Sequence, residues 1–192
     1  MFIVIVSVAV AGILLVMNVT TKGSADPLIH KQALAIAESL LEEVELMPFT
    51  FCDPNDPAAA TAANSTFCAA GMDQDKGGAA LTSPTPAGET RYLLGNPFDN
   101  VADYGGCQMN TGTINACDTT GTNGIRDINN NVIGPAAGYS ASIAIARRGL
   151  TMAPALLADA DALLITVTVT GPDGVPVVIE GIRTRYSPNA VP

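Results

Sequence analysis

The first 17 residues constrain the fold most, because the run MFIVIVSVAVAGILLVM contains no charge and only one polar side chain, Ser7. As an α-helix this run is about 25 Å long, slightly short of the roughly 30 Å hydrocarbon core of a membrane. A cleaved signal peptide normally has a basic region and a small-residue cleavage site, and neither is convincing here. The mixture of small and β-branched residues suits close packing of helices. The run therefore predicts a helix that lies either in a membrane or among identical helices.

A polar stretch separates this helix from a second one. Residues 18–25, NVTTKGSA, include Gly23, so we expect the helix to loosen or break near 18–26. Asp26 and Pro27 are typical of a new helix start, because Asp can cap free amides and Pro suits the first turn.

The second helix is predicted over residues 27–47 and ends at Pro48. Apolar residues recur there at helical spacing and form one stripe. The stripe consists of Ile29, Ala33, Ile36, Leu40, Val44 and Met47. Acidic residues gather near the C-terminal end, where they oppose the helix dipole. This charge indicates either a compensating partner or a solvated face.

Residues 49–137 are predicted to be mainly loops, with a short strand at 89–94, and the clear strand signals lie in 138–187. Residues 164–170, LITVTVT, alternate apolar residues with Thr, and the turn Gly171-Pro172-Asp173-Gly174 leads into a return strand over 177–186. The predicted fold class is α+β: a long, two-part N-terminal helix packed on a small antiparallel sheet. Residues 1–25 then form the membrane or filament-core helix with its break, and residues 26–192 form the head.

The four cysteines are Cys52, Cys68, Cys107 and Cys117. They allow three pairings, and the close spacings favour Cys52–Cys68 and Cys107–Cys117. No CxxC spacing occurs and the chain has 1 His, which argues against a zinc site. Two disulfides indicate an oxidising compartment.

The charge balance argues against general nucleic-acid binding, since 18 acidic residues face 9 basic ones and the net charge is −9. Two short basic runs, Arg147–Arg148 and Arg183–Arg185, could form a local patch, but solvated strand ends are the favoured interpretation.

No group of residues predicts catalysis or cofactor binding. His30 is interpreted as a helix-surface residue. Asp127, Asn129 and Asn131 resemble the alternating oxygen ligands that open a calcium loop, but Val132 stands where such a loop has Gly. A turn built on Asn and Asp is favoured over this weak calcium candidate. The sequence thus predicts a protein that is not an enzyme.

Several segments in order along most of the chain resemble type IV pilin-like proteins, and within them the D-subunit family of minor pilins of mannose-sensitive haemagglutinin (MSHA) pili. The resemblance is specific in the helix and moderate in the β region. The segments are the apolar run 2–17, Ser24-Ala25-Asp26-Pro27, QALAIAESLLEE at 32–43, Gly88-Glu89-Thr90-Arg91, FDNVADY at 98–104 and the late hairpin ending in Tyr186.

The resemblance implies a structural or assembly subunit, a minor pilin, anchored in the inner membrane with a periplasmic head before it enters a filament at the cell surface. Its implied partners are other pilin subunits through the N-terminal helix, inner-membrane lipid, and a prepilin peptidase if a leader lies upstream. The basic leader, the Gly cleavage site and the early glutamate of such pilins, on which processing and N-methylation depend, are not in this sequence, so we expect Met1 to align inside the mature protein. The alternatives are a type II secretion pseudopilin, or a tip adhesin or DNA-binding module displaying loops 49–137.

Overall fold

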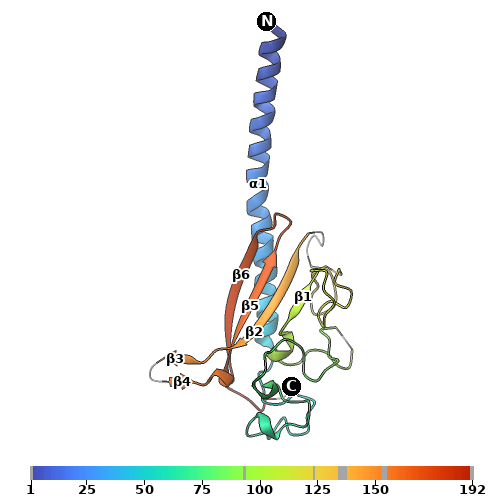
Figure 1. The fold of residues 1–192 in the computed structure, drawn as a ribbon, viewed down its shortest axis with the longest axis vertical. Helices are drawn as coiled ribbons and strands as arrows, with labels where there is room; N and C mark the ends of the chain where they lie inside the picture. The colour runs from blue at the N-terminus through green and yellow to red at the C-terminus, as the bar shows by residue number, and fades with distance from the viewer. Residues whose placement is uncertain (1, 93, 123, 134–137, 153–154, 191–192) are drawn as a thin grey trace.

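A long helix and a four-stranded sheet define the architecture (Figure 1). The computed structural model describes the backbone of residues 2–92, 94–122, 124–133, 138–152 and 155–190, and the side chains of 6–7, 10–13, 27–92, 94–122, 124–133, 138–149 and 157–190. Helix α1 spans Phe2–Leu46. Its N-terminal half projects beyond the rest of the molecule, whereas its C-terminal half lies against the sheet.

The predicted break near 18–26 is wrong, because α1 continues through it with Pro27 inside the helix. Proline in a helix interior costs about 3 kcal/mol. Ending a helix and starting another requires a new nucleus, whereas continuing it adds one residue at a time. Helix-forming sequence on both sides therefore outweighs the polar stretch.

The predicted membrane span is also contradicted. Within the described residues, no helix is both long and apolar enough to cross a membrane. This finding overturns the transmembrane helix and removes the basis for the inner-membrane location. The fold class expected from the sequence is therefore wrong in its account of α1: the apolar and amphipathic halves are not separate helices, and the described side chains that pack on the sheet belong to the segment from Pro27 onward.

The stripe along the second half of α1 is confirmed. Ala33, Ile36, Leu40 and Val44 are buried, and Ile29 and Met47 pack against the same core at its edges. These residues contact strands β5 and β6. Burying apolar surface stabilises a fold by roughly 25 cal/mol per Å², so this stripe is the main attachment of α1 to the sheet. Helix α1 ends at Leu46, just before Met47 and Pro48. A proline disfavours the helical backbone conformation in the residue that precedes it.

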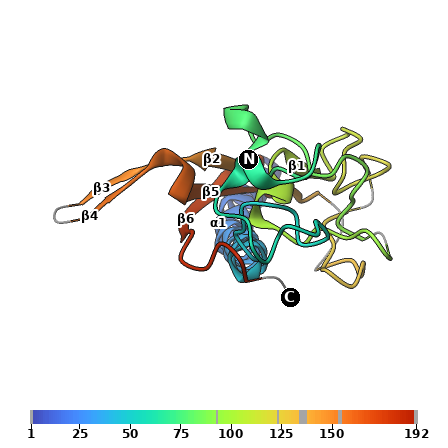
Figure 2. The same cartoon turned by 90° about the horizontal axis from the view of Figure 1, so that it is seen from below.

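The sheet is antiparallel throughout, in the order β1-β2-β5-β6. Its strands are β1 (Cys107–Met109), β2 (Ser140–Arg147), β5 (Ala162–Thr170) and β6 (Pro176–Thr184). Viewed along α1, the helix lies on one face of this sheet (Figure 2). The predicted alternation in β5 is confirmed, since Ile165, Val167 and Val169 are buried and the Thr residues between them are half-buried.

The predicted late hairpin is confirmed as β5–β6, with Thr170 opposite Pro176. Gly181 in β6 lies directly under α1. A Cβ atom there would come within 2.2 Å of Glu45 Oε1 and 2.9 Å of Leu41 Cδ1. The helix and the strand approach closely here, and a larger residue would displace the ends of these two side chains.

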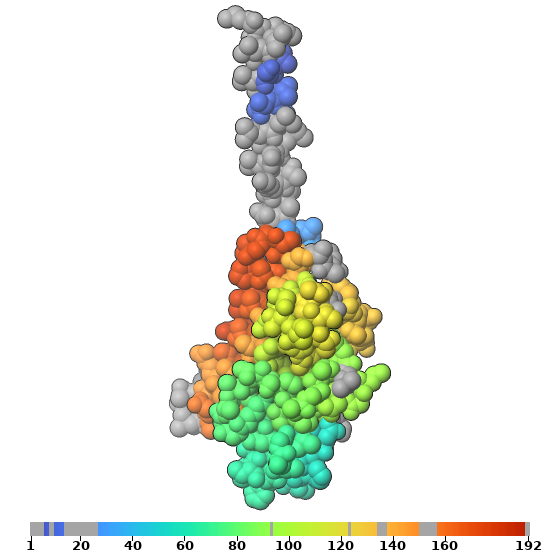
Figure 3. Space-filling model, turned by 45° about the vertical axis from the view of Figure 1, so that its right-hand side comes forward, coloured from blue at the N-terminus to red at the C-terminus, as the bar shows by residue number. Residues whose placement is uncertain are grey.

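Residues 48–133 are named here the loop region. Their first part forms the end of the head furthest from the start of α1, and their later part runs along the side of the head beside β1 (Figure 1 and Figure 3). The predicted strand at 89–94 is wrong: the described residues there are irregular, and the buried polar residues Glu89 and Arg91 take the place of an apolar face.

A small hairpin of β3 (Leu150–Met152) and β4 (Ala155–Leu157) extends sideways from the sheet. The 3-10 helices are η1 (Ser65–Phe67), η2 (Lys76–Gly78), η3 (Val101–Tyr104) and η4 (Asp159–Asp161).

Candidate functional site

The part of α1 that precedes the head, residues 2–26, is named here the stem. Its described side chains include Val6, Val10 and Ile13, which are 42%, 50% and 59% exposed. Their spacings of four and three residues place them on one side of the helix. The sequence has no charge before Lys22. A stem of 25 residues is about 37 Å long. The stem is thus uncharged up to Lys22, and its exposed apolar stripe has no covering surface within the described side chains.

A buried ion pair connects α1 to the loop region. Arg91, whose side chain is 0% exposed, donates from Nε to Glu43 Oε1 at 2.7 Å and from Nη2 to Glu43 Oε2. The Tyr104 hydroxyl donates to the same carboxylate at 2.8 Å. Burial and then the charge of Glu43 raise the pKa of Tyr104 well above its ordinary value. Part of the acidic charge near the end of α1 is therefore compensated by a partner inside the head.

Two of the basic residues are not the predicted solvated strand ends, whereas Arg148 is exposed as predicted. Arg185 has a side chain that is 1% exposed, pairs with Asp75 at 2.6 Å, and stacks on Phe49 with its guanidinium carbon 4.1 Å from the ring centre. Arg147 donates to the Ala79 carbonyl oxygen at 2.8 Å. These two cations fasten the sheet to the loop region. They are therefore not available as a patch for nucleic acid.

Both disulfides lie in the loop region. Cys52 is joined to Cys68 and Cys107 to Cys117, each with Cα atoms 5.3 Å apart. This is the pairing that the short spacings favour. The first disulfide closes the loop at the far end of the head, and the second ties β1 to the segment that follows it.

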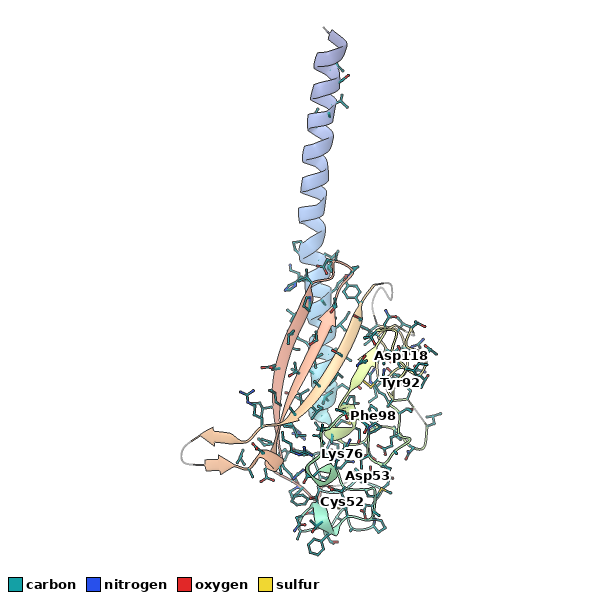
Figure 4. The ribbon with its side chains drawn as sticks, in the orientation of Figure 1. Cys52, Asp53, Lys76, Tyr92, Phe98 and Asp118 are labelled. Carbon is teal, nitrogen blue, oxygen red and sulfur yellow. A yellow bond between two sulfur atoms is a disulfide. The ribbon has the colours of Figure 1, made fainter. Side chains whose placement is uncertain are left out.

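A group of carboxylates lies next to the first disulfide, where Figure 4 labels Cys52 and Asp53. Oxygen atoms of Asp53, Glu89 and Asp99 lie within 4.8 Å of one another. Asp53 is 0% exposed and Glu89 is 1% exposed, whereas Asp99 is half-buried. We call these three residues the carboxylate cluster. Close acidic groups in a buried place repel one another unless protons or a cation neutralise them.

The hydrogen bonds around the carboxylate cluster are incomplete. Asp53 Oδ1 accepts from the Asn55 backbone N–H at 2.7 Å, and Asn55 Nδ2 donates to Asp99 Oδ2 at 3.0 Å. Neither oxygen of Glu89 receives a hydrogen bond from a donor group, and its own hydrogen-bond contact is with the Asp53 carboxyl group. Asp99 Oδ1 and Oε1 of the buried Gln74 beside them are also unpaired. Buried polar atoms in native proteins are normally paired with protein or water, so this gathering of oxygens without donors is unusual.

Electrostatics in the carboxylate cluster favour the neutral acids. Burial, followed by the charges of Asp103 and Asp53, raises the pKa of Glu89 to about 9. Burial and the Asp53 charge raise the pKa of Asp99 to about 7, and burial raises that of Asp103 to about 7. Lys76, whose charge interacts with Asp103 and Glu89, has its pKa lowered by burial, and its ammonium donates to the Ser83 carbonyl oxygen. The region therefore carries more acid than its own cations neutralise.

The weak calcium candidate at 127–131 forms a closed turn. Asp127 Oδ1 accepts from the Asn131 backbone N–H at 2.8 Å, and the Asp127 N–H donates to the Asn131 carbonyl at the same distance. The hydrogen bond from Asn131 lowers the pKa of Asp127. The Asp127 carboxylate is therefore engaged by hydrogen bonds within the turn, including one from the Asn129 backbone. His30 is exposed on α1.

Sequence reasoning missed the carboxylate cluster. Its members are separated by 36 and 10 residues, so no short spacing links them. The sequence offered one indication. Glu89 falls in a segment predicted as a strand, and acidic residues are rarely buried there without a partner.

Comparisons of the chain with models of protein families, with curated proteins and with solved structures find no match. The similarity to type IV pilin-like proteins therefore stays a prediction that rests on the sequence segments given above.

Proposed function

We propose that this chain is a structural subunit of a type IV pilus-like filament, which assembles by packing its stem against the stems of other subunits. The observation that carries the proposal is the projection of residues 2–26 beyond the head with the apolar stripe of Val6, Val10 and Ile13 exposed. Exposed apolar stripes of this kind mark surfaces that bind another molecule.

The composition of the stem favours equivalent helices as its partner. With no charge before Lys22, neighbouring copies do not repel one another. Small and β-branched residues also allow helix backbones to approach closely. The head is tied to the second half of the same helix by apolar packing and by the Glu43–Arg91 ion pair. A bundle of stems would therefore display the heads in a fixed orientation on its surface.

Charge substitutions in the stem test this function without disturbing the head. Ile13→Glu places a charge on the stripe, at a residue that is 59% exposed. The matched control is Leu94→Glu, which adds the same charge at an apolar residue of the head that is 99% exposed. We expect the wild-type chain and Leu94→Glu to sediment as filaments visible by electron microscopy, and Ile13→Glu to remain unassembled. Equal assembly of all three proteins would refute the proposal.

A further inference from the structure

The carboxylate cluster has the chemistry of a cation site that is separate from the stem. Asp53, Glu89 and Asp99 come from three segments of the loop region and bring oxygen atoms within 4.8 Å of one another. Hard divalent cations bind such carboxylate oxygens, and the spacing allows one ion to contact all three groups. The second group of this kind, Cys52, Asp56 and Cys68, is unsuitable, because its sulfur atoms form a disulfide and are not thiolates.

A second observation points to a ligand. Glu89 is 1% exposed, lies within the cluster, and receives no hydrogen bond from a donor at either carboxyl oxygen. Gln74 is equally buried. Its amide nitrogen donates to the Thr85 carbonyl at 2.8 Å and to Asp53 Oδ2 at 3.4 Å, which leaves its amide oxygen unpaired. Buried polar oxygens that lack a donor cost free energy, and a bound cation would satisfy these oxygens together.

We propose that Asp53, Glu89 and Asp99 bind one calcium ion, which joins three segments of the loop region at the far end of the head. Calcium fits better than magnesium, because the ligands stand on irregular loops and calcium accepts flexible geometry with more oxygen ligands. Asp99 is half-buried and the adjoining Asn55 is exposed, so the ion reaches the site from solvent. The disulfides indicate an oxidising compartment, where calcium-binding modules commonly work at Kd values of roughly 10⁻⁴–10⁻³ M.

Isothermal titration of the full chain, stripped with EGTA, with calcium chloride tests the site. We expect binding by the wild type, a rise in Tm with calcium, and about a tenfold or greater loss of affinity in both Glu89→Gln and Asp99→Asn. The control Asp127→Asn changes an exposed acid in the 127–131 turn and should bind as the wild type does. Circular dichroism without calcium establishes that each variant is folded.

Three results would overturn the assignment. They are the absence of both heat and Tm shift in the wild type, full affinity in the folded Glu89→Gln and Asp99→Asn variants, and loss of binding in Asp127→Asn alone. Magnesium should bind more weakly than calcium, and equal affinity for both ions would contradict a calcium site. None of these outcomes depends on filament assembly, so the proposed function is tested separately.

Discussion

The sheet with its covering helix and the loop region are held together by different interactions. In the first, apolar residues recur at the period of a helix or a strand and meet in one core, as Leu40 and Ile165 do. In the second, residues far apart in the chain are joined by disulfides, by the Glu43–Arg91 pair and by hydrogen bonds to buried acids. The difference shows that one domain can combine two kinds of region. One is specified by the periodic placement of apolar residues, and the other by particular pairs of residues that bind each other.

The largest expected effect comes from removing Arg91. Arg91→Ala leaves Glu43 partly buried without its cation, and breaking a buried pair in this way costs about 3–5 kcal/mol. The control Arg148→Ala, at an exposed residue next to β2, should change the free energy of unfolding by less than about 0.5 kcal/mol. Urea unfolding of the three proteins measures the difference.

The same pair offers a sharper test. The double variant Glu43→Met with Arg91→Met removes both charges, so it should be more stable than Arg91→Ala. If the double variant is as unstable as Arg91→Ala, the lost free energy of unfolding comes from packing and not from the unpaired charge. The loop region would then be held mainly by packing, as the sheet is.

The next effect is a dependence of stability on pH. In the metal-free protein the folded state keeps the Glu89 proton up to a pKa of about 9, whereas the unfolded chain loses it near the ordinary value of 4.5. The folded state therefore binds more protons between these values, and its stability is greatest below the unfolded pKa and falls as the pH rises. From pH 5 to 8 the loss due to Glu89 is up to about 4 kcal/mol.

Glu89→Gln removes this titration and should flatten the pH profile, as measured by thermal unfolding in EDTA. Asp127→Asn, outside the cluster, should keep the wild-type slope. If stability depends on pH in Glu89→Gln as steeply as in the wild type, proton binding by Glu89 is not the cause of that dependence.

The smallest of the three effects concerns the disulfides. Replacing Cys52 and Cys68 by Ala releases a loop with a separation of 16 residues and should cost about 3 kcal/mol. The corresponding change at Cys107 and Cys117, with a separation of 10, should cost about 0.4 kcal/mol less. Unchanged stability in both variants would mean that noncovalent contacts suffice for the loop region.

The contrast between the regions also explains what sequence reasoning could predict. The stripe of α1 and the alternation of β5 repeat over many residues, so their period reveals both the element and its buried face. The uninterrupted path of α1 through Pro27 was missed, because local residue preferences are weak beside the cooperativity of a long helix.

The loop region offered much less to sequence analysis. The burial of Glu89 and Arg91 depends on partners 36 to 48 residues away, Asp53 and Glu43, and no periodic pattern encodes such partners. The short cysteine spacings were the exception, since closing a short loop makes neighbouring cysteines natural partners.

We infer that helix α1 has two roles. Residues 27–46 are fixed to the head, and residues 2–26 are available to bind other subunits. Hydrogen exchange along α1, followed in dilute and in assembled protein, tests this claim directly. We predict slow exchange at 27–46 in both states, and exchange at 2–26 that is fast in dilute protein and becomes slow on assembly. Assembly that protects the head while leaving 2–26 unchanged would contradict the account.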